Sequence, residues 1–329
     1  GKPVITANKE LLAKHGPELF EQADQGNLDL LFEAAVAGGI PLMRALRESL
    51  KGEPIRRVMG IVNGTTNYVL SQMTETGMSY GDALAEAQSA GFAESDPSAD
   101  VEGQDAASKA AIIAMVAFGA RLGLSDVTYE GITQISAEDI DFAKRFGHTI
   151  KLLAIAEHDN GEVAVRVHPA MVPDHHPLAS VRDSFNAVFV EGEAVGDLML
   201  YGRGAGGSPT ASAVLGDILA AANNLTQSTN NGLGNLRKAS IQSTEDLENA
   251  FYINLEVTDE PGVLAAVASV FGNHGVSIRS MEQEGLGGEA RIVFITHASK
   301  ERNVHSTLDE LSELDCVIQI GTKIRVVGA

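Results

Sequence analysis

Residues 87–109 read AQSAGFAESDPSADVEGQDAASK, and this stretch places five carboxylates and one lysine directly before a long apolar segment. Carboxylates at this density are costly anywhere except at a surface or a polar site. The residues that follow Lys109 are apolar on every side, as in a buried helix. Asp105 and Lys109 are four residues apart, so a helix that begins here projects both side chains from one face. We therefore expect the charges at the mouth of a core helix.

Two interpretations of this stretch are open. In the first it is only a helix start, with Asp96 as N-cap, Pro97 in the first turn and acids favoured by the helix dipole. In the second, the complete pattern carries function, because it resembles the homoserine dehydrogenases. That resemblance rests on VITANK at residues 4–9, on GRGAGGSPTASAVLGDI at residues 202–218, and on eleven spaced positions: Ala87, Gly91, Phe92, Ala93, Asp96, Pro97, Asp100, Val101, Gly103, Asp105 and Lys109.

The composition is that of a soluble globular protein with two or three domains. The chain has 329 residues, of which 44% are hydrophobic and 21% charged. A net charge of −20 argues against nucleic acid or an anionic membrane surface as a partner. No run approaches the ~20 apolar residues of a membrane span, and no signal peptide is visible, so we expect a cytoplasmic protein. The single cysteine, Cys316, excludes an internal disulfide framework.

Residues 1–34 predict a strand, a helix and a second strand. The helix ELLAKHGPELFEQAD is expected to break at Gly16-Pro17, and LDLLFEA has the continuous apolarity of a buried parallel strand. A dinucleotide-binding fold needs a glycine turn after its first strand. The resemblance places that turn N-terminal to VITANK, which implies that residues 1–34 are the C-terminal remnant of a Rossmann-type domain that this chain mostly lacks.

Residues 35–225 predict a domain with helices first and strands later. Helical patterns run to about residue 122, and strands dominate from Val127 to Tyr201, so we expect a mixed sheet covered by helices. Gly202–Gly207 reads GxGxxG after a strand and before a helix. We reject a second dinucleotide unit, because the polar, glycine-rich LTQSTNNGLGNL follows where a parallel strand is required. The resemblance assigns catalysis and dimerisation to this domain.

The C-terminal part predicts a polar linker at residues 226–249 and a βαββαβ unit at residues 250–329. The unit resembles the amino-acid-binding ACT domains and has a ferredoxin-like fold. The resemblance implies an end-product amino acid as effector, here threonine, at the first turn with Asp259 and Gly262. A dimerisation module that binds no ligand is the alternative.

The resemblance also implies roles for individual residues. Lys109, Asp105 and Lys9 would be catalytic; Glu94 and Asp100, with Asp105 and Lys109, would bind the substrate. Lys9, Asn8 and Gly204 would contact the cofactor, which is NADP or NAD. A sodium ion would be held at Glu33, Val36, Gly38 and Ile40.

Two functions from different classes remain open at this point. The first is an NAD(P)H-dependent homoserine dehydrogenase of threonine, methionine and isoleucine biosynthesis, a dimer or tetramer regulated by threonine, in which this fragment itself is inactive if the cofactor domain is missing. The second is a non-catalytic amino-acid sensor in which the ACT unit is the functional part. Dinucleotide binding separates the two.

Overall fold

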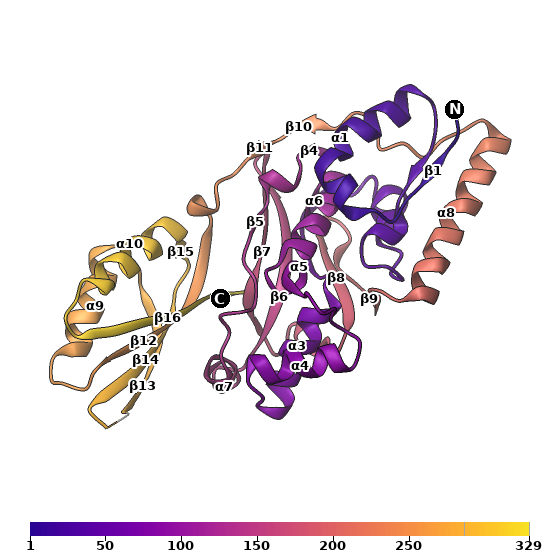
Figure 1. Ribbon diagram of the computed structural model, residues 1–329. Helices are drawn as coiled ribbons and strands as arrows, with labels where there is room; N and C mark the ends of the chain where they lie inside the picture. The colour runs from indigo at the N-terminus through magenta and orange to yellow at the C-terminus, as the bar shows by residue number, and fades with distance from the viewer. Residues whose placement is uncertain (286, 329) are drawn as a thin grey trace.

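One mixed sheet runs through both lobes of the molecule in Figure 1. The computed structural model describes residues 1–285 and 287–328, and within them the sheet has twelve strands. Nine form the path β13-β14-β12-β16-β7-β6-β3-β8-β9. Their bounds are β3 (Ile55–Ile61), β6 (His148–Asp159), β7 (Glu162–Pro173), β8 (Phe185–Gly192), β9 (Gly196–Arg203), β12 (Glu248–Thr258), β13 (Ile278–Gly285), β14 (Glu289–Thr296) and β16 (Val317–Val326).

The larger lobe is the predicted mixed sheet covered by helices. Strand β6 is buried on both faces, which explains its continuous apolar sequence: Leu152 packs in the helix-covered core, while Leu153 packs on the opposite face. The helices of this lobe are α3 (Gly64–Thr76), α4 (Tyr80–Ser89), α5 (Ser98–Val101), α6 (Gln104–Phe118) and α7 (Ala137–Arg145). Helix α6 carries the alanine-rich segment and is buried, as its apolarity predicts.

The outer edge of β7 is covered in three separate patches, each two residues long and parallel to β7. The covers come from three distant segments, and each protects its own part of the edge. They are β11 (Ser240–Ile241) on Glu162–Val163, β5 (Thr128–Tyr129) on Arg166–Val167, and the end of β16 on Ala170–Met171. The last of these makes the sheet continuous between the lobes.

The N-terminal unit is a strand, helix and strand, with β1 (Val4–Ile5) parallel to β2 (Leu30–Leu31) and α1 (Lys9–Gln25) between them. The predicted break at Gly16-Pro17 is wrong, because α1 is continuous through Pro17. Both residues are buried, and a Cβ on Gly16 would lie 3.0 Å from the Met115 Cε of α6. Close packing on α6 thus offsets the free-energy cost of the helix hydrogen bond that Pro17 cannot make.

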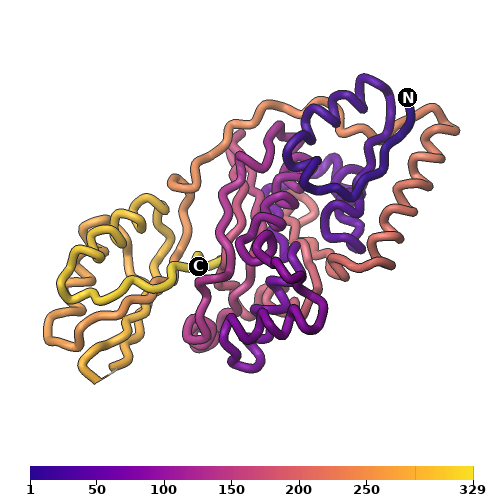
Figure 2. The backbone as a smooth tube through the Cα atoms, viewed as in Figure 1, coloured from indigo at the N-terminus to yellow at the C-terminus, as the bar shows by residue number. Residues whose placement is uncertain are grey.

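Helix α8 (Gly207–Gln227) lies along the outside of the larger lobe (Figure 1). From its end the chain crosses back over this lobe to the smaller one, as Figure 2 shows. On the way, β10 (Arg237–Lys238) pairs with β4 (Ala120–Arg121). The remaining short elements are α2 (Leu42–Arg44), the π-helical turn Ala45–Ser49, β15 (Ser299–Lys300) and the 3₁₀ turns Glu33–Ala35, Leu124–Asp126, Pro177–Ser180 and Thr244–Asp246.

The smaller lobe has the predicted βαββαβ order. Strands β12, β13, β14 and β16 form its sheet, and α9 (Val263–Asn273) and α10 (Glu301–Ser312) cover one face. The helix-covered face of its sheet has a core of its own that includes Leu255, Phe271 and Phe294, whereas Tyr252 and Val293 pack in the core of the larger lobe. Among the residues described in both lobes, no helix has the length and apolarity needed to cross a lipid bilayer.

Lys151 of β6 is a fully buried lysine that holds a loop in place. Its ammonium donates to Asn67 Oδ1 (3.1 Å) and to the Val181 carbonyl. Asn67 in turn donates to the carbonyl of Asp183 (2.9 Å). Burial, with a smaller contribution from Arg182, lowers the pKa of Lys151 to about 8.

This lowered pKa predicts that stability rises with pH. Between about pH 8 and 10.5 the unfolded chain keeps the Lys151 proton while the folded chain releases it. Relative to Lys151→Met, the free energy of unfolding of the unmodified protein should therefore rise by roughly 3 kcal/mol across this window. Urea unfolding of both proteins at several pH values measures the difference. A difference that stays flat with pH would contradict the assignment.

Candidate active site

Asp105 and Lys109 form an ion pair at the start of α6. Their side chains project from one face of the helix, with Lys109 Nζ 2.7 Å from Asp105 Oδ2. Lys109 Nζ also donates to the Val62 carbonyl at the end of β3 (2.7 Å). An ammonium has three N–H donors, so one remains for a further acceptor. The Lys109 side chain is 13% exposed, so it is largely buried but still reaches the surface.

Asn63 connects the carboxylates of this cluster. Its side-chain amide donates to Asp105 Oδ2 (2.8 Å) and to Asp100 Oδ1 (2.7 Å). Its amide oxygen accepts from the Thr66 N–H and so caps α3. An asparagine at a helix start is a common cap, and this local role is what the sequence position alone indicates. The hydrogen bonds to carboxylates 37 and 42 residues away leave no local signal beyond an asparagine at a strand end.

Lys9 approaches the same carboxylate from α1. Its ammonium lies 3.1 Å from Asp105 Oδ1, so Asp105 bridges two lysines from different helices. Asn8, the neighbouring residue, caps α1 through a hydrogen bond from the Leu11 N–H (3.0 Å). The cap fixes the first turn of α1 and with it the position of Lys9.

The electrostatics of the cluster favour its ionised form. Burial of Asp105 opposes ionisation, but Lys109, Asn63 and Lys9 outweigh it and hold the pKa of Asp105 below its ordinary value. Burial of Lys9 likewise favours the neutral amine, yet the Asp105 carboxylate raises the pKa of Lys9 above its usual value. At neutral pH, Asp105 is therefore a carboxylate that faces at least one ammonium.

The acid-rich loop before α6 differs in part from the predicted helix start. Helix α5 begins at Ser98, with Pro97 at the N-cap position and Asp96 accepting from the Ser98 N–H (3.1 Å). The chain then breaks at Gly103, which has a φ of 89°, and α6 starts anew. This break turns Asp100 and Asp105 toward Asn63. Glu94 is exposed, and its main-chain carbonyl accepts from Gln88 (3.1 Å).

The predicted metal and cofactor residues lie in two loops that touch each other. Gly38 has a φ of 40°, and a Cβ there would overlap the Gly204 carbonyl. A Cβ on Gly204 would in turn overlap the Asn186 side chain, so both positions require glycine. Glu33 is buried and accepts from the Met43 N–H (2.9 Å) and the Arg44 N–H (2.8 Å), capping α2.

A cavity of about 320 Å³ lies beside this loop contact. Glu33, Gly38 and Ile40 line it, but Val36 does not. Burial first, and then the nearby Asp217 carboxylate, raises the pKa of Glu33 above its ordinary value against the helix-capping bonds. Across the described residues, no three His, Cys, Asp or Glu side chains cluster as metal ligands, so carbonyl oxygens would have to complete a cation site here.

The predicted effector residues lie far along the chain, in the smaller lobe. Asp259 and Gly262 are both exposed, and Gly262 has a φ of 97° at the start of α9. The Asp259 N–H donates to the Gly288 carbonyl (3.2 Å). The turn is therefore fixed by its backbone and leaves the Asp259 carboxylate toward solvent.

A buried carboxylate, Asp139 of α7, joins the two lobes. From its own lobe it accepts hydrogen bonds from the Ser136 N–H and hydroxyl, both at 3.0 Å. From the smaller lobe it accepts from Tyr252 Oη (2.9 Å), Thr322 Oγ1 (2.6 Å) and, more weakly, Asn254 Nδ2 (3.4 Å). These polar contacts to one helix N-terminus hold the smaller lobe in place, together with the pairing of β16 on β7 and the apolar packing of Tyr252.

Comparisons with known proteins agree with this division. Residues 41–219 match the family model described as homoserine dehydrogenase, and residues 251–316 match the ACT domain model. The chain is 49% identical to the homoserine dehydrogenase of Corynebacterium glutamicum over 332 residues, covering 99% of this chain and 75% of that protein.

Two solved structures extend the comparison. A homoserine dehydrogenase from Thiobacillus denitrificans superposes with a TM-score of 0.95 at 39% identity, covering 99% of this chain and 76% of that one. A hyperthermophilic archaeal homoserine dehydrogenase mutant in complex with NADPH gives a TM-score of 0.59 at 33% identity, covering 68% and 64% of the two chains.

Proposed function

This chain belongs to the homoserine dehydrogenase family, and we propose that it interconverts L-aspartate 4-semialdehyde and L-homoserine with a nicotinamide cofactor. The observation that carries the proposal is the third donor of Lys109. Two of its N–H groups are held by Asp105 and the Val62 carbonyl, and the last is free for a substrate oxygen.

The residues divide the work of an aldehyde reduction among them. When bound, NADPH or NADH would supply the hydride that the carbonyl carbon receives. As negative charge develops on the carbonyl oxygen, the Lys109 ammonium stabilises it and donates a proton, directly or through a water. Asp105 keeps the Lys109 ammonium oriented, and Asp100 and Glu94 bind the substrate ammonium. Asn63 fixes the positions of the Asp100 and Asp105 carboxylates relative to each other through its two hydrogen bonds.

The cofactor contacts follow from the start of α1 and the 204–207 loop. Lys9 is a cation near the mouth of the cluster, suited to the cofactor's amide or phosphate oxygens. A Cβ on Gly207 would meet no atom within 4 Å, so the main chain there is open to a close approach by a ligand. These features fit a nicotinamide dinucleotide at this loop, with Lys9, Asn8 and Gly204 beside it.

Sodium binding is part of the same proposal. The Glu33 carboxylate and main-chain oxygens of Val36, Gly38 and Ile40 would hold the ion, since hard cations take oxygen ligands. A cation here would offset the buried Glu33 and Asp217 carboxylates. Its role would be structural, because it would fix the contact between residues 36–40 and the cofactor loop.

The direct test is turnover by the protein expressed from its complete gene. The protein is given aspartate 4-semialdehyde with NADPH or NADH, and cofactor consumption is monitored as the decrease in nicotinamide absorbance. Homoserine is then identified by mass spectrometry. Comparing the two cofactors decides between NADP and NAD. If neither supports homoserine formation, the proposal fails.

The proposed enzyme is a homo-oligomer, at least a dimer. Strand β9 is the end of the sheet path and exposes Tyr201 (54%), while the adjoining helix α8 exposes a stripe that includes Leu215 and Leu219 (58%). An apolar stripe beside an open strand edge is the kind of surface that a second copy covers.

Leu219→Glu should convert the oligomer to monomers. A charge in the centre of an apolar interface is left buried and unpaired, which weakens association by orders of magnitude. Size-exclusion chromatography with light scattering measures the mass. Gln25→Glu adds the same charge at an exposed position of α1 and should leave the oligomer intact. An unchanged mass for Leu219→Glu would place the interface elsewhere.

Regulation by threonine is also proposed. The smaller lobe belongs to the ACT domains, which bind amino acids. The turn at Asp259 and Gly262 offers backbone N–H groups at the start of α9 and an exposed carboxylate, which suit the two charged ends of an amino acid.

A further inference from the structure

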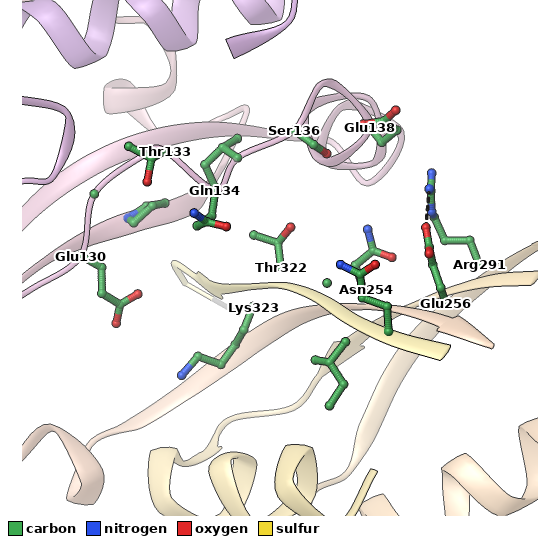
Figure 3. Close-up of a pocket in the computed structure, with 16 residues that line it drawn as sticks. Glu130, Thr133, Gln134, Ser136, Glu138, Asn254, Glu256, Arg291, Thr322 and Lys323 are labelled. Carbon is green, nitrogen blue, oxygen red and sulfur yellow. Dashed lines mark hydrogen bonds and ion pairs between the residues drawn. The ribbon is translucent and has the colours of Figure 1, made fainter. Parts of the chain in front are cut away.

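Two cavities lie between the lobes, and neither is lined by Asp105 or Lys109. The larger, of about 570 Å³, is the one in Figure 3, with Glu130 and Lys323 on its walls. The smaller has a volume of about 260 Å³. This is just below the roughly 300 Å³ at which sites for drug-sized molecules begin, so the smaller cavity suits a small ion with a few waters.

The smaller cavity lies on the sheet face that points away from the helices. Met59 and Ile155, which line it, belong to the apolar cluster on that face. Arg166 and His168 are two residues apart on β7, so their side chains project from the same face. Residues 247–250, at the start of β12, and the end of β16 form other parts of the wall. An occupant of this cavity would therefore touch both lobes.

Three buried polar atoms of the lining residues have no hydrogen-bond partner among the described residues. They are Arg166 Nε, His168 Nε2 and Asn249 Nδ2. Arg166 is 5% exposed and His168 is 2% exposed, so bulk solvent does not compensate for the missing partners. A buried donor or acceptor without a partner destabilises the fold. Three such atoms around one cavity indicate a polar occupant.

The unpartnered atoms are two donors and one acceptor. His168 Nδ1 lies 2.9 Å from the Pro169 carbonyl, which can only accept, so Nδ1 carries the hydrogen. Burial, and then Arg325 and Arg166, lower the pKa of His168 well below its ordinary value. The ring is therefore neutral at neutral pH, and its Nε2 is an acceptor. Arg166 Nε and the Asn249 amide nitrogen are donors.

The charges of the lining favour an anion. The Glu157 carboxylate is shared by Arg166 (2.7 Å) and Arg57 (3.6 Å). Arg57 also pairs with Glu191, which does not line the cavity. Glu248, the other carboxylate of the lining, is exposed to solvent. The lining thus carries three arginines against two carboxylates.

The third arginine, Arg325, has its carboxylate partners outside the cavity. It pairs with Glu301 and, at 2.9 Å, with Glu130. Glu130 lines the larger cavity, as Figure 3 shows, and Glu301 lines neither. The charges that act most strongly on His168 are the cations Arg325, Arg166 and Lys323. The field at the His168 ring is therefore positive, which stabilises a negative charge beside it.

We propose that the smaller cavity binds a small oxyanion that still carries a proton, hydrogenphosphate or bicarbonate. Its oxygens accept from Arg166 Nε and from the Asn249 amide, and its hydroxyl donates to His168 Nε2. Sulfate is fully ionised at neutral pH and has no hydroxyl for the third contact. The anion connects β7 to the start of β12 and so joins the lobes. Its binding does not depend on the dehydrogenase reaction.

Calorimetry on the protein expressed from its complete gene tests the ligand. Phosphate, bicarbonate and sulfate are titrated separately at neutral pH and equal ionic strength, with NADPH present so that phosphate does not occupy a cofactor site. Phosphate or bicarbonate should bind with a Kd of about 1 mM or tighter. Sulfate should bind about tenfold more weakly or worse, because it leaves the His168 acceptor unpaired.

Two substitutions test the position of the anion. Asn249→Asp keeps the side-chain shape but places a carboxylate beside the anion, and it should weaken Kd by about tenfold or more. Arg166→Met removes one donor and should have a similar effect, while Glu157 keeps Arg57 as a partner. Asn160→Asp adds the same charge in the exposed turn between β6 and β7 and should leave Kd within about twofold.

Three results would overturn the site. Absence of binding by both phosphate and bicarbonate at about 10 mM would mean that water alone fills the cavity. Equal binding of sulfate would remove His168 Nε2 as an acceptor. An unchanged Kd in folded Asn249→Asp and Arg166→Met, with folding checked by thermal melting, would place the anion elsewhere. None of these measurements uses turnover, so failure of the dehydrogenase assay would refute the proposed reaction and leave the anion site standing.

Discussion

Lys109→Met should lower kcat by about 10³-fold or more while the protein stays folded. A positioned acid contributes typically 10²- to 10⁴-fold, and Lys109 is asked both to stabilise the developing alkoxide and to protonate it. Methionine fills a similar volume, and Asp105 keeps Lys9 as a partner at 3.1 Å, so no buried carboxylate is left unpaired. Steady-state kinetics of aspartate semialdehyde reduction measures the effect.

The matched control is Lys14→Met, which removes an exposed lysine from the neighbouring helix α1. It loses the same charge but should keep kcat within about twofold, because an exposed lysine away from the cluster contributes little. A kcat near normal in Lys109→Met, with homoserine still formed, would remove Lys109 from the reaction. The circular dichroism spectrum and melting temperature establish that the variant is folded.

Asp139→Ala should destabilise the protein by about 3 kcal/mol or more. The change leaves the buried Tyr252 hydroxyl and the part-buried hydroxyls of Ser136 and Thr322 without this acceptor, and each unsatisfied buried donor costs about 1 to 3 kcal/mol. Because the donors of Tyr252 and Thr322 belong to the smaller lobe, we expect the loss to appear as separation of the lobes before global unfolding. Urea unfolding followed by limited proteolysis in the 226–249 segment detects both.

Asp141→Ala is the control on the same helix. Its carboxylate is 68% exposed and pairs with Arg145 at 3.4 Å, so its loss should cost well under about 1 kcal/mol. Equal destabilisation by the two substitutions would mean that Asp139 acts only as a capping residue of α7 and does not anchor the smaller lobe.

The sequence predicted those features that depend on local pattern. The i, i+4 spacing of Asp105 and Lys109 placed both on one face of α6, and the ion pair is there at 2.7 Å. Alternating elements after Ala250 gave the βαββαβ order of the smaller lobe. Local pattern failed at Pro17, where contacts with α6 decide the outcome, and at Asp96, where Gly103 splits the expected helix in two.

The features that the sequence did not predict all depend on residues far apart in the chain. Asn63 has the signature of a helix cap, and nothing nearby indicates that its amide also holds two carboxylates. The same holds for Asp139, which Ser136 marks as part of a capping box, although its partners in the smaller lobe lie more than a hundred residues away. In both cases the sequence indicates a helix cap, and the hydrogen bonds to distant residues are seen only in the folded structure.

The patchwork cover of β7 sets a limit on how the chain can be cut. An open strand edge is a template for pairing with other chains. Here the smaller lobe contributes one of the three segments that cover the edge of β7, through the end of β16. Deleting that lobe would remove the cover from Ala170 and Met171, and cutting before Ser240 would also expose Glu162 and Val163. A shortened enzyme therefore needs a charged substitution on β7 to resist aggregation, even if its catalytic residues are untouched.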